Sequence, residues 1–512
     1  MYTGLEGFLV PFSSLTLIWW IGIGTFVGLY VGAIPGLSVT MAVSLLISFT
    51  FSWEVLPALA IMVGIFTGGV YGGARSGILL NIPGAPAAVA SAFDGYPLAK
   101  MGLAGEAMGL STTQSVIGDF FGIIILALFA PLIAQLALIF MPRDYFLLAF
   151  MGLFLVGSLA EGSMAKALVA AFLGILVGLI GMDPQTGQGR MTFETLELMG
   201  GIHFVIVMIG TFGISEALLQ LQTKTQPVKQ KITRVTPKWD VIRDNIGLTL
   251  RTSTIGVIIG ALPGTGGDIA ALMAYDHAKR TVKNPYPKPF GQGAYQGLIA
   301  PEAACNAAIG GAFIPMMTLG IPGDSVTAVL IGALIIHGLR PGPMLIREQP
   351  EFFWFVVGAL VLSNVFLYIC GMTGIRLFSK IVEVPKPIII PIIIVLTFVG
   401  GYSIQNSITD IYWMIGFGIL GYFMKRFGYP VAPLVLGIIL SPIIDSNFRR
   451  GVQMEHGSAL DFFGAMFTNA VPLVLLGLMV LTAIVSNPKI TASIKRMFLG
   501  NRKQVEAQGP EN

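Results

Sequence analysis

Apolar positions dominate the chain in runs long enough to cross a lipid bilayer. Such runs begin near 9–34, recur near 107–140 and 246–262, and end near 463–486. About 20 consecutive apolar residues are needed to span the hydrocarbon core as a helix. From these runs, we predict an all-α polytopic membrane protein with roughly 10–12 transmembrane helices and additional re-entrant pieces.

Two short Gly/Pro sequences interrupt these runs, and each occurs twice. Gly-Ala-Ile-Pro-Gly at 32–36 returns as Gly-Ala-Leu-Pro-Gly at 260–264, and we call the shift between these two copies the break offset. Ile-Pro-Gly at 82–84 returns at 321–323, and we call the shift between these two copies the tip offset. Interrupted helices in the same order in both halves indicate an internal repeat and point to a transporter's binding site.

Each half is predicted to contain a helix broken at Pro-Gly, a spanning helix, and an apolar hairpin with Ile-Pro-Gly at its tip. Lipid cannot hydrogen-bond free backbone groups, so broken helices are tolerated only where they face protein or a wet cavity. Four breaks in two related positions therefore favour an internal polar cavity. The alternative is that Gly and Pro only kink or pack the helices, as both often do in membranes.

Basic residues are concentrated in three segments, and their placement predicts the topology. The segments 224–243, 277–288 and 489–503 are cytoplasmic by the positive-inside rule. Residues 1–14 contain no Lys or Arg, and the two repeats are inverted if the first starts outside and the second inside. The predicted parts are membrane repeat 1 (1–222), a basic cytoplasmic linker (223–245), membrane repeat 2 (246–488) and a cytoplasmic tail (489–512).

Composition supports a membrane protein and argues against other classes. The chain has 512 residues, 54% hydrophobic and 11% charged, whereas soluble domains carry about 25% charge. Cys305 and Cys370 lie in apolar sequence and suggest no disulfide framework, and the four histidines show no metal-ligand spacing. We therefore predict no metal site, no cofactor and no nucleic-acid partner.

The two Pro-Gly breaks are predicted to form an anion site. A helix that restarts after Pro-Gly presents free backbone N–H groups at its positive dipole end. Hydroxyl side chains follow each break, and a carboxylate is the natural ligand of such paired helix starts. The alternative is a flexible Gly-rich turn at the membrane surface. The substrate-binding residues expected here are Pro35, Gly36, Ser38, Thr40, Pro263, Gly264, Thr265 and Gly266.

The hairpin tips and the helix before the second tip carry further polar candidates. Carbonyls freed by proline, with nearby amide and hydroxyl oxygens, would suit substrate or a Na⁺ ion. Ordinary helix capping by Asp324 and Ser325 is an equally good interpretation. Glu302 and Asn306 share a helix face that could line the cavity, although a proline followed by Glu302 is also typical of a cap. The substrate-binding residues expected here are Asn81, Pro83, Gly84, Asn306, Pro322, Gly323 and Ser325.

Comparing the halves identifies carboxylates that only one half carries. The break offset aligns Thr40 with Asp268, and the tip offset aligns Ala85 with Asp324. Isolated ionisable groups in membranes are costly and usually functional. We therefore predict that Asp268 carries the coupling ion, with Asp324 as the second choice. The alternative for Asp268 is an interfacial pair with a basic residue further along its helix.

Three other features are weaker candidates for a functional role. Arg75 could pair with a substrate carboxylate, but an anchor at the membrane boundary is the simpler interpretation. Asp119, inside an apolar run, is a weaker ion-path candidate. The sequence Asp-Gly-Tyr-Pro at 94–97 is interpreted as a turn that closes the first hairpin.

No nucleophile elbow, phosphate loop or pair of catalytic carboxylates is apparent, so an enzyme is disfavoured. Two functional classes remain. One is a carrier with alternating access. The other is an ion or solute channel that uses the same broken helices as a filter.

Six motifs follow one another along residues 15 to 480, at 32–38, 71–84, 94–100, 263–268, 310–312 and 320–325. Together they resemble the TctA family, the large membrane subunit of tripartite tricarboxylate transporters. The resemblance implies a multi-pass protein of the bacterial inner membrane that imports a carboxylate, a tricarboxylate or related organic acid, by symport with Na⁺ or H⁺. Its implied partners are a small four-helix membrane subunit and a periplasmic solute-binding protein that delivers the substrate.

Overall fold

The computed structural model of the protein describes residues 4–34, 37–81, 85–159, 163–183, 185–222, 235–374 and 386–486. Pro35 and Gly36 of the first break, and Pro83 and Gly84 of the first hairpin tip, lie outside the described residues. Most of the linker and the tail lie outside them as well. The roles predicted for these segments therefore stay predictions.

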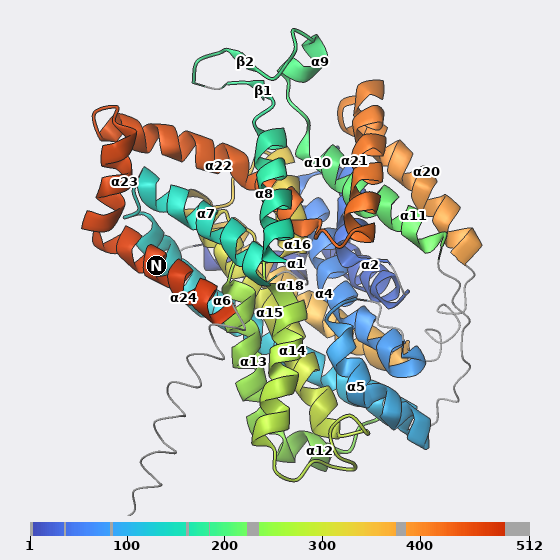
Figure 1. Ribbon diagram of the computed structural model, residues 1–512. Coiled ribbons are helices and arrows are strands. Elements are labelled where there is room, and N and C mark those ends of the chain that lie inside the picture. The colour runs from blue at the N-terminus through green and yellow to red at the C-terminus, as the bar shows by residue number, and fades with distance from the viewer. Residues whose placement is uncertain are drawn as a thin grey trace, which may run out of the picture.

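The described residues are mostly helical, which confirms the predicted all-α class (Figure 1). The first half contains α1 (Val10–Ser13), α2 (Leu15–Ala33), α3 (Val39–Thr50), α4 (Val55–Leu80), α5 (Ala88–Leu98), α6 (Ala104–Ala137), α7 (Pro142–Leu159), α8 (Met164–Gly178), α9 (Leu196–Met199), α10 (Phe204–Met208) and α11 (Ser215–Gln220). The second half contains α12 (Trp239–Asp244), α13 (Ile246–Ala261), α14 (Gly266–Thr281), α15 (Tyr295–Leu319), α16 (Ser325–Ile336), α17 (Pro343–Glu348), α18 (Pro350–Thr373), α20 (Lys386–Gln405), α21 (Ile408–Arg426), α22 (Ala432–Met454), α23 (Ala459–Thr468) and α24 (Ala470–Ser486). Shorter elements are the 3-10 turn η1 (Leu5–Leu9), the π segments η2 (Ala99–Leu103) and η3 (Ile209–Ile214), and the antiparallel strands β1 (Gly181–Met182) and β2 (Gly189–Arg190).

Several helices are long and apolar enough to cross a membrane, so the chain is a multi-pass membrane protein. Within the described residues they are Leu15–Ala33, Val55–Leu79, Ala88–Ala137, Tyr295–Leu319 and Pro350–Thr373, and the bent pair α23 and α24 would add a sixth crossing. Other apolar helices, including α3, α13 and α16, have only 10–17 residues. The prediction of roughly 10–12 crossings also counted runs such as 246–262, which forms the 16-residue helix α13.

The predicted repeat is present as two helix pairs with equivalent packing. A Cβ atom on Gly28 of α2 would lie 2.4 Å from the carbonyl oxygen of Ile65 in α4. A Cβ atom on Gly256 of α13 would lie 2.2 Å from the carbonyl oxygen of Ala304 in α15. The break offset relates the two glycines, and the tip offset relates the two residues that they contact. Small residues allow this close approach of membrane helices.

The two spanning helices α4 and α15 also end in the same way. Asn81 follows α4 with a φ of 55°, and Gly320, at the equivalent position by the tip offset, follows α15 with a φ of 71°. Both residues are left-handed, a conformation that commonly ends a helix. The hairpin tips therefore begin at equivalent points in the two halves.

The equivalent helices α4 and α15 run in opposite directions. The rings of Phe66 and Phe313 lie 5.8 Å apart. Further along α4, Tyr71 hydrogen-bonds to Thr112 of α6. The neighbouring residue of α6, Ser111, donates to Glu302 of α15. From the level of the two phenylalanine rings to the level of Tyr71 and Glu302, residue numbers rise along α4 and fall along α15. Opposite directions in equivalent helices are what an inverted repeat requires.

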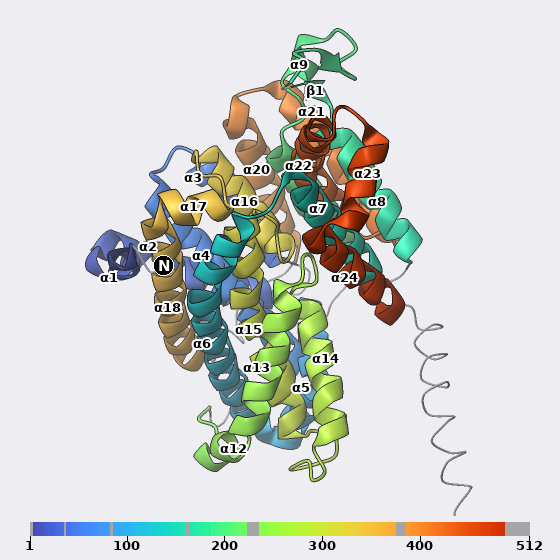
Figure 2. The same cartoon turned by 90° about the vertical axis from the view of Figure 1, so that its left-hand side faces the viewer.

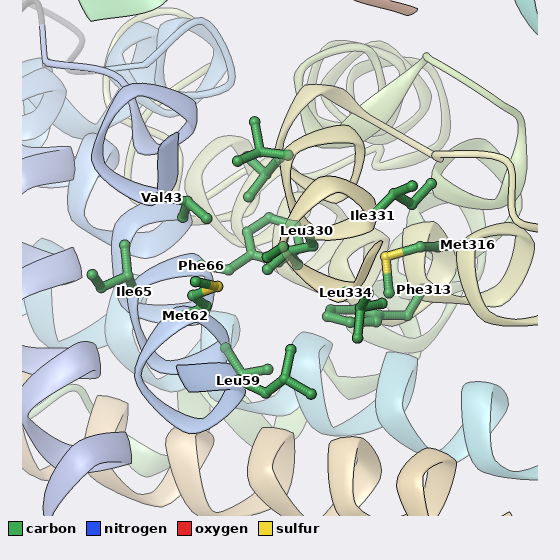
Figure 3. Close-up of a cluster of buried hydrophobic side chains, with 14 of the residues drawn as sticks. Val43, Leu59, Met62, Ile65, Phe66, Phe313, Met316, Leu330, Ile331 and Leu334 are labelled. Atoms are coloured by element: carbon green, nitrogen blue, oxygen red, sulfur yellow. The ribbon is translucent and has the colours of Figure 1, made fainter. Parts of the chain in front are cut away.

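Helices of both repeats meet in a shared apolar core. Figure 2 shows α6, α13, α15 and α18 packed along one another. Phe66 of α4, Phe313 of α15 and Leu330 of α16 are at most 1% exposed, and Figure 3 shows them together with Val43 of α3. Because this core joins segments of both repeats, it fixes the helix breaks of one half against the hairpin of the other.

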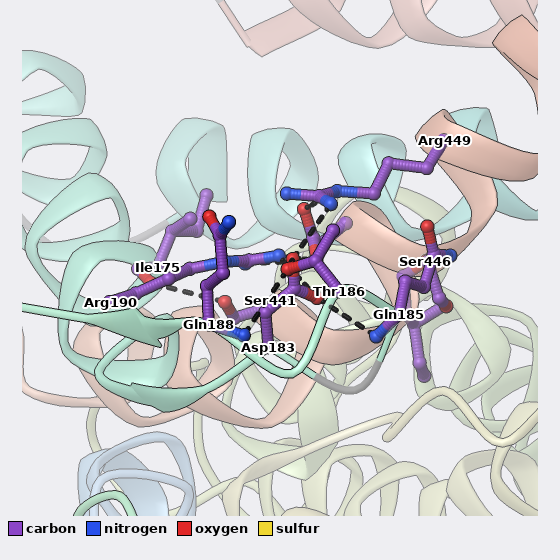
Figure 4. A network of polar contacts seen from close by, with 11 residues as sticks. Ile175, Asp183, Gln185, Thr186, Gln188, Arg190, Ser441, Ser446 and Arg449 are labelled. Atoms are coloured by element: carbon purple, nitrogen blue, oxygen red, sulfur yellow. Dashed lines mark hydrogen bonds and ion pairs between the residues drawn. The ribbon is translucent and has the colours of Figure 1, made fainter. Parts of the chain in front are cut away.

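The β1–β2 hairpin projects from one end of the molecule (Figure 1) and is anchored to α22 by charge. Arg190 contacts Asp183 at 2.8 Å and Asp445 at 3.0 Å, and Arg449 contacts Asp183 at 2.9 Å (Figure 4). Hydrogen bonds from Thr186 and then from Arg190 hold the pKa of the Asp183 carboxyl below its usual range.

Candidate functional site

Four helices begin next to the breaks and tips singled out in the sequence. Helices α3 and α14 start after the two Pro-Gly breaks, and α5 and α16 start after the two hairpin tips. In each case the chain re-enters a helix after Pro-Gly, so free backbone N–H groups and a positive dipole end are presented there. The starts make contact in two pairs, and each pair combines one element from each repeat.

The first pair joins the start of α3 to the start of α16. The hydroxyl oxygens of Thr40 and Ser325 lie 2.9 Å apart, so one donates to the other. Thr40 is buried and Ser325 is half-buried. Two residues predicted to bind substrate from opposite halves of the sequence are thus in direct contact.

The second pair joins the start of α14 to the start of α5. The backbone N–H of Ala87 donates to Oδ1 of Asp268 at 3.0 Å. No side chain of its own caps α5, so Asp268 supplies a negatively charged cap from the other repeat. Asp268 is nonetheless exposed, so its carboxylate is also accessible to solvent or a ligand.

These two contacts join nearly equivalent positions of the two repeats. The break offset takes Thr40 to Asp268, and the tip offset takes Ala87 to Val326, the neighbour of Ser325. Each break therefore meets the hairpin of the other repeat at a position that is equivalent to within one residue. A hydroxyl occupies this point in one copy and a carboxylate occupies it in the other.

At the second break, two left-handed glycines and the hydrogen bonds of Thr265 set the course of the backbone. Gly264 and Gly266 have φ values of 78° and 63°, which favour glycine because it has no Cβ atom. The Thr265 hydroxyl donates back to the carbonyl oxygens of Leu262, at 3.0 Å, and Ile259. In this structure Thr265 thus closes the end of α13, while Ser38 caps α3 by accepting from the backbone N–H of Met41 at 3.1 Å.

At the second hairpin tip, the capping interpretation of Asp324 is observed. Asp324 Oδ1 accepts from the backbone N–H and the hydroxyl of Thr327, both at 2.7 Å, and the Thr327 hydroxyl accepts from the Asp324 N–H. This reciprocal arrangement is a capping box. Gly266 packs on the Asp324 side chain, so the second break and the second tip adjoin.

A buried carboxylate beside the site was not among the predicted site residues. Glu302 is 2% exposed and accepts hydrogen bonds from Ser91 of α5 and from Ser111 and Ser115 of α6, the last two at 2.9 Å. Sequence reasoning placed Glu302 on a cavity face but had no signal for the serines, which lie in the other half of the sequence. Asn306, one turn later, donates to the Glu302 carbonyl oxygen at 2.9 Å.

Two simpler interpretations of the sequence are wrong. Arg75 is not a boundary anchor but is fully buried, and it donates to Tyr71 and to the carbonyl oxygen of Gly371. Residues 94–97 are not a turn but lie inside α5. Asp94 accepts from the N–H groups of Gly293 and Ala294, both at 2.8 Å, so tertiary contacts override the local preference for a turn.

Comparison with known proteins identifies the family of this chain. Residues 18–436 match the model of the tripartite tricarboxylate transporter TctA family. The chain is 35% identical over 459 residues, 89% of its length and 91% of the relative's, to the "uncharacterized 52.8 kDa protein in TAR-I ttuC' 3'region" of Agrobacterium vitis. It is 37% identical over 245 residues, 48% of its length and 99% of the relative's, to the "uncharacterized protein in TAR-II ttuC' 3'region" of the same organism. No solved structure gave a significant match. The chain belongs to the tripartite tricarboxylate transporter TctA family.

Proposed function

We propose that this chain is the large transmembrane subunit of a binding-protein-dependent secondary transporter. It imports a carboxylate, a tricarboxylate or related organic acid, across the bacterial inner membrane by symport with Na⁺ or H⁺. Its partners are a small four-helix membrane subunit and a periplasmic solute-binding protein. The observation that carries the proposal is the contact of each helix break with the hairpin of the other repeat. We call the two contacts, Thr40 with Ser325 and Asp268 with Ala87, the doubled contact.

The doubled contact suits an organic anion. Two helix starts from each repeat face one another, and helix N-termini attract carboxylates through their N–H groups and positive dipole ends. Thr40 and Ser325 share one hydrogen bond and can turn their hydroxyl groups to a ligand instead. A carboxylate substrate would replace the contact between the halves with contacts of its own.

Asp268 is the proposed coupling-ion residue because it is the carboxylate of this doubled contact. A bound cation or proton would neutralise it beside an anionic substrate, which would favour loading both together. Substrate and ion would then cross as one unit. The capping box at Asp324 leaves that residue as the second choice.

Reconstituted transport tests the function. Proteoliposomes containing both membrane subunits receive the binding protein and a labelled organic acid from a panel that includes citrate, with and without imposed Na⁺ and pH gradients. We expect accumulation above the external concentration that one of the gradients drives. Downhill flux that ignores both gradients would instead identify a channel.

The variant Asp268→Asn tests the coupling residue in the same system. Asparagine keeps an oxygen that can accept from Ala87, so the helix cap and the fold are retained. We expect ion-driven accumulation to fall at least tenfold. Asp276→Asn on the same helix, an exposed residue paired with Arg280, is the matched control and should transport normally. Unchanged accumulation by Asp268→Asn would remove Asp268 from the mechanism.

A further inference from the structure

Four buried side chains on four helices have oxygen atoms without a hydrogen-bond partner among the described residues. The atoms are Thr67 Oγ1 on α4, both carboxylate oxygens of Asp119 on α6, Asn306 Oδ1 on α15 and Asn364 Oδ1 on α18. Each of these side chains is at most 3% exposed. A buried polar group without a partner costs free energy, and a buried charge costs far more. Such a set of acceptors therefore calls for a donor or a cation.

The register of α6 against α15 places two of the four side chains at one level. Ser115 of α6 donates to Glu302 of α15, and glycines further along α6 pack on later residues of α15, so the two helices run in the same direction. Asp119 and Asn306 each lie four residues after this pair, which is one turn along both helices. They therefore follow the Ser115–Glu302 contact on the same side of the interface.

The other two side chains reach the same turn of α6. The amide nitrogen of Asn364 donates to the carbonyl oxygen of Val116 at 3.0 Å, which fixes the amide beside the turn that contains Asp119. Tyr71 of α4 hydrogen-bonds to Thr112 of α6, and α4 runs opposite to α6. Thr67, one turn before Tyr71, thus lies about 6 Å further along α6, at the level of Val116, whose carbonyl oxygen holds the Asn364 amide.

The repeat supports this convergence. The tip offset takes Thr67 to Asn306, so the two are equivalent positions of the inverted repeats. They lie on helices that pack against each other, and both have an unpartnered oxygen among the described residues. Asp119 and Asn364 add a carboxylate and a second amide oxygen beside this pair.

We propose that Thr67, Asp119, Asn306 and Asn364 form a buried Na⁺ site. Oxygen atoms of hydroxyl, amide and carboxylate groups are the hard ligands that such a cation prefers. A single carboxylate balances a single positive charge, whereas a divalent ion would leave an excess charge inside the membrane. A proton on Asp119 would give one donor and satisfy one acceptor, while a central cation satisfies all of them.

Glu302 shows the contrast on the adjacent turn. Its carboxylate accepts from three serine hydroxyls, so its charge is solvated by the protein without an ion. Asp119 has no such donors among the described residues. The proposal deepens the proposed function, which includes Na⁺ as a coupling ion, by adding an ion site apart from Asp268. It concerns cation binding by the isolated chain and requires neither substrate nor partners.

The test is Na⁺ binding by the purified full chain in detergent. Thermal stability and ²²Na⁺ binding are measured while Na⁺ replaces choline or K⁺ at constant ionic strength. A ligand that binds only the folded state stabilises it according to its concentration relative to Kd. We expect Na⁺, but not choline or K⁺, to raise the melting temperature, with saturable ²²Na⁺ binding.

Two variants connect this response to the four residues. Asp119→Asn should abolish Na⁺ binding, and Thr67→Val, which is nearly isosteric, should raise the Kd for Na⁺ at least tenfold. Without Na⁺, Thr67→Val should be as stable as the wild type, because the hydroxyl that it removes has no partner among the described residues. Matched controls are Asp410→Asn on α21 and Ser48→Ala on α3, which also have unpartnered buried oxygens among the described residues but lie on other helices.

The proposal is overturned if the wild type binds no Na⁺, or if Thr67→Val binds Na⁺ as tightly as the wild type does. If Asp119→Asn fails to fold, Thr67→Val alone decides. Failure of carboxylate uptake in proteoliposomes would leave this result unaffected, because binding is measured without substrate.

Discussion

Carboxylates near the predicted cavity have different local environments, and these separate their roles. Asp268 caps a helix of the other repeat, Asp324 caps its own helix, and Glu302 accepts from serines. All three have donors in the structure. The side chain of Asp119 has none among the described residues, which is why it is the proposed ligand of a buried ion.

At this scale Asp324 offers a direct test of capping against ion binding. Asp324→Ala removes the capping box and should lower stability by about 1 kcal/mol, whereas Asp324→Ser keeps a capping oxygen and should lose much less. Apparent melting temperatures of the purified variants in detergent check this. If Asp324→Ser is as stable as the wild type but its uptake no longer follows the ion gradient, then Asp324 also holds the coupling ion.

Residue positions were predictable from the sequence only where the repeat made them comparable. Alignment of the two halves singled out Thr40 and Asp268, and the second Ile-Pro-Gly sequence singled out Ser325. The structure places all three in the doubled contact. The serines around Glu302 have no such signal, because they come from α5 and α6 of the other half. The burial of Arg75 was not predictable, because its partners, Tyr71 excepted, are distant in sequence.

Among the elements, the pairs α2–α4 and α13–α15 depend on glycine at the points of closest approach. Gly256→Ala should destabilise the protein, because its Cβ atom would lie 2.2 Å from a backbone carbonyl oxygen and the helices would have to separate. We expect a loss of about 1–3 kcal/mol, seen as a lower melting temperature.

Gly247 on the same helix is the matched control. Nothing lies within 4 Å of a Cβ atom placed there, so Gly247→Ala should be neutral or stabilising through helix propensity. Equal effects of the two substitutions would show that α13 and α15 do not pack as the structure shows.

Helical elements were predictable because long apolar runs in a membrane must satisfy their backbone groups internally. Their boundaries were not. Residues 94–97 combine Gly, Tyr and Pro, yet α5 continues through them because Asp94 is held by backbone N–H groups of the other half. A single sequence contains no information about such contacts between distant segments.

On the scale of the whole molecule, the network of Asp183, Arg190, Asp445 and Arg449 joins the β1–β2 hairpin to α22. Because the pKa of Asp183 is lowered in the folded state, its contribution to stability is present above its unfolded pKa of about 4 and is lost as pH falls toward the folded value. The difference in melting temperature between the wild type and Asp183→Asn should therefore be constant above about pH 5 and shrink below about pH 4. A difference that grows on acidification would contradict this assignment.

The doubled contact also has a consequence for the history of the protein. Two separate copies of a half-length ancestor, inserted in opposite orientations, could have built the same arrangement as a symmetric dimer. Such a dimer must carry the same residue at both equivalent positions. Duplication and fusion into one chain remove this constraint, so the residues at the equivalent positions 40 and 268 can differ, as threonine and aspartate do. Two copies within one chain can thus place a charge on one side of the doubled contact that the other side lacks.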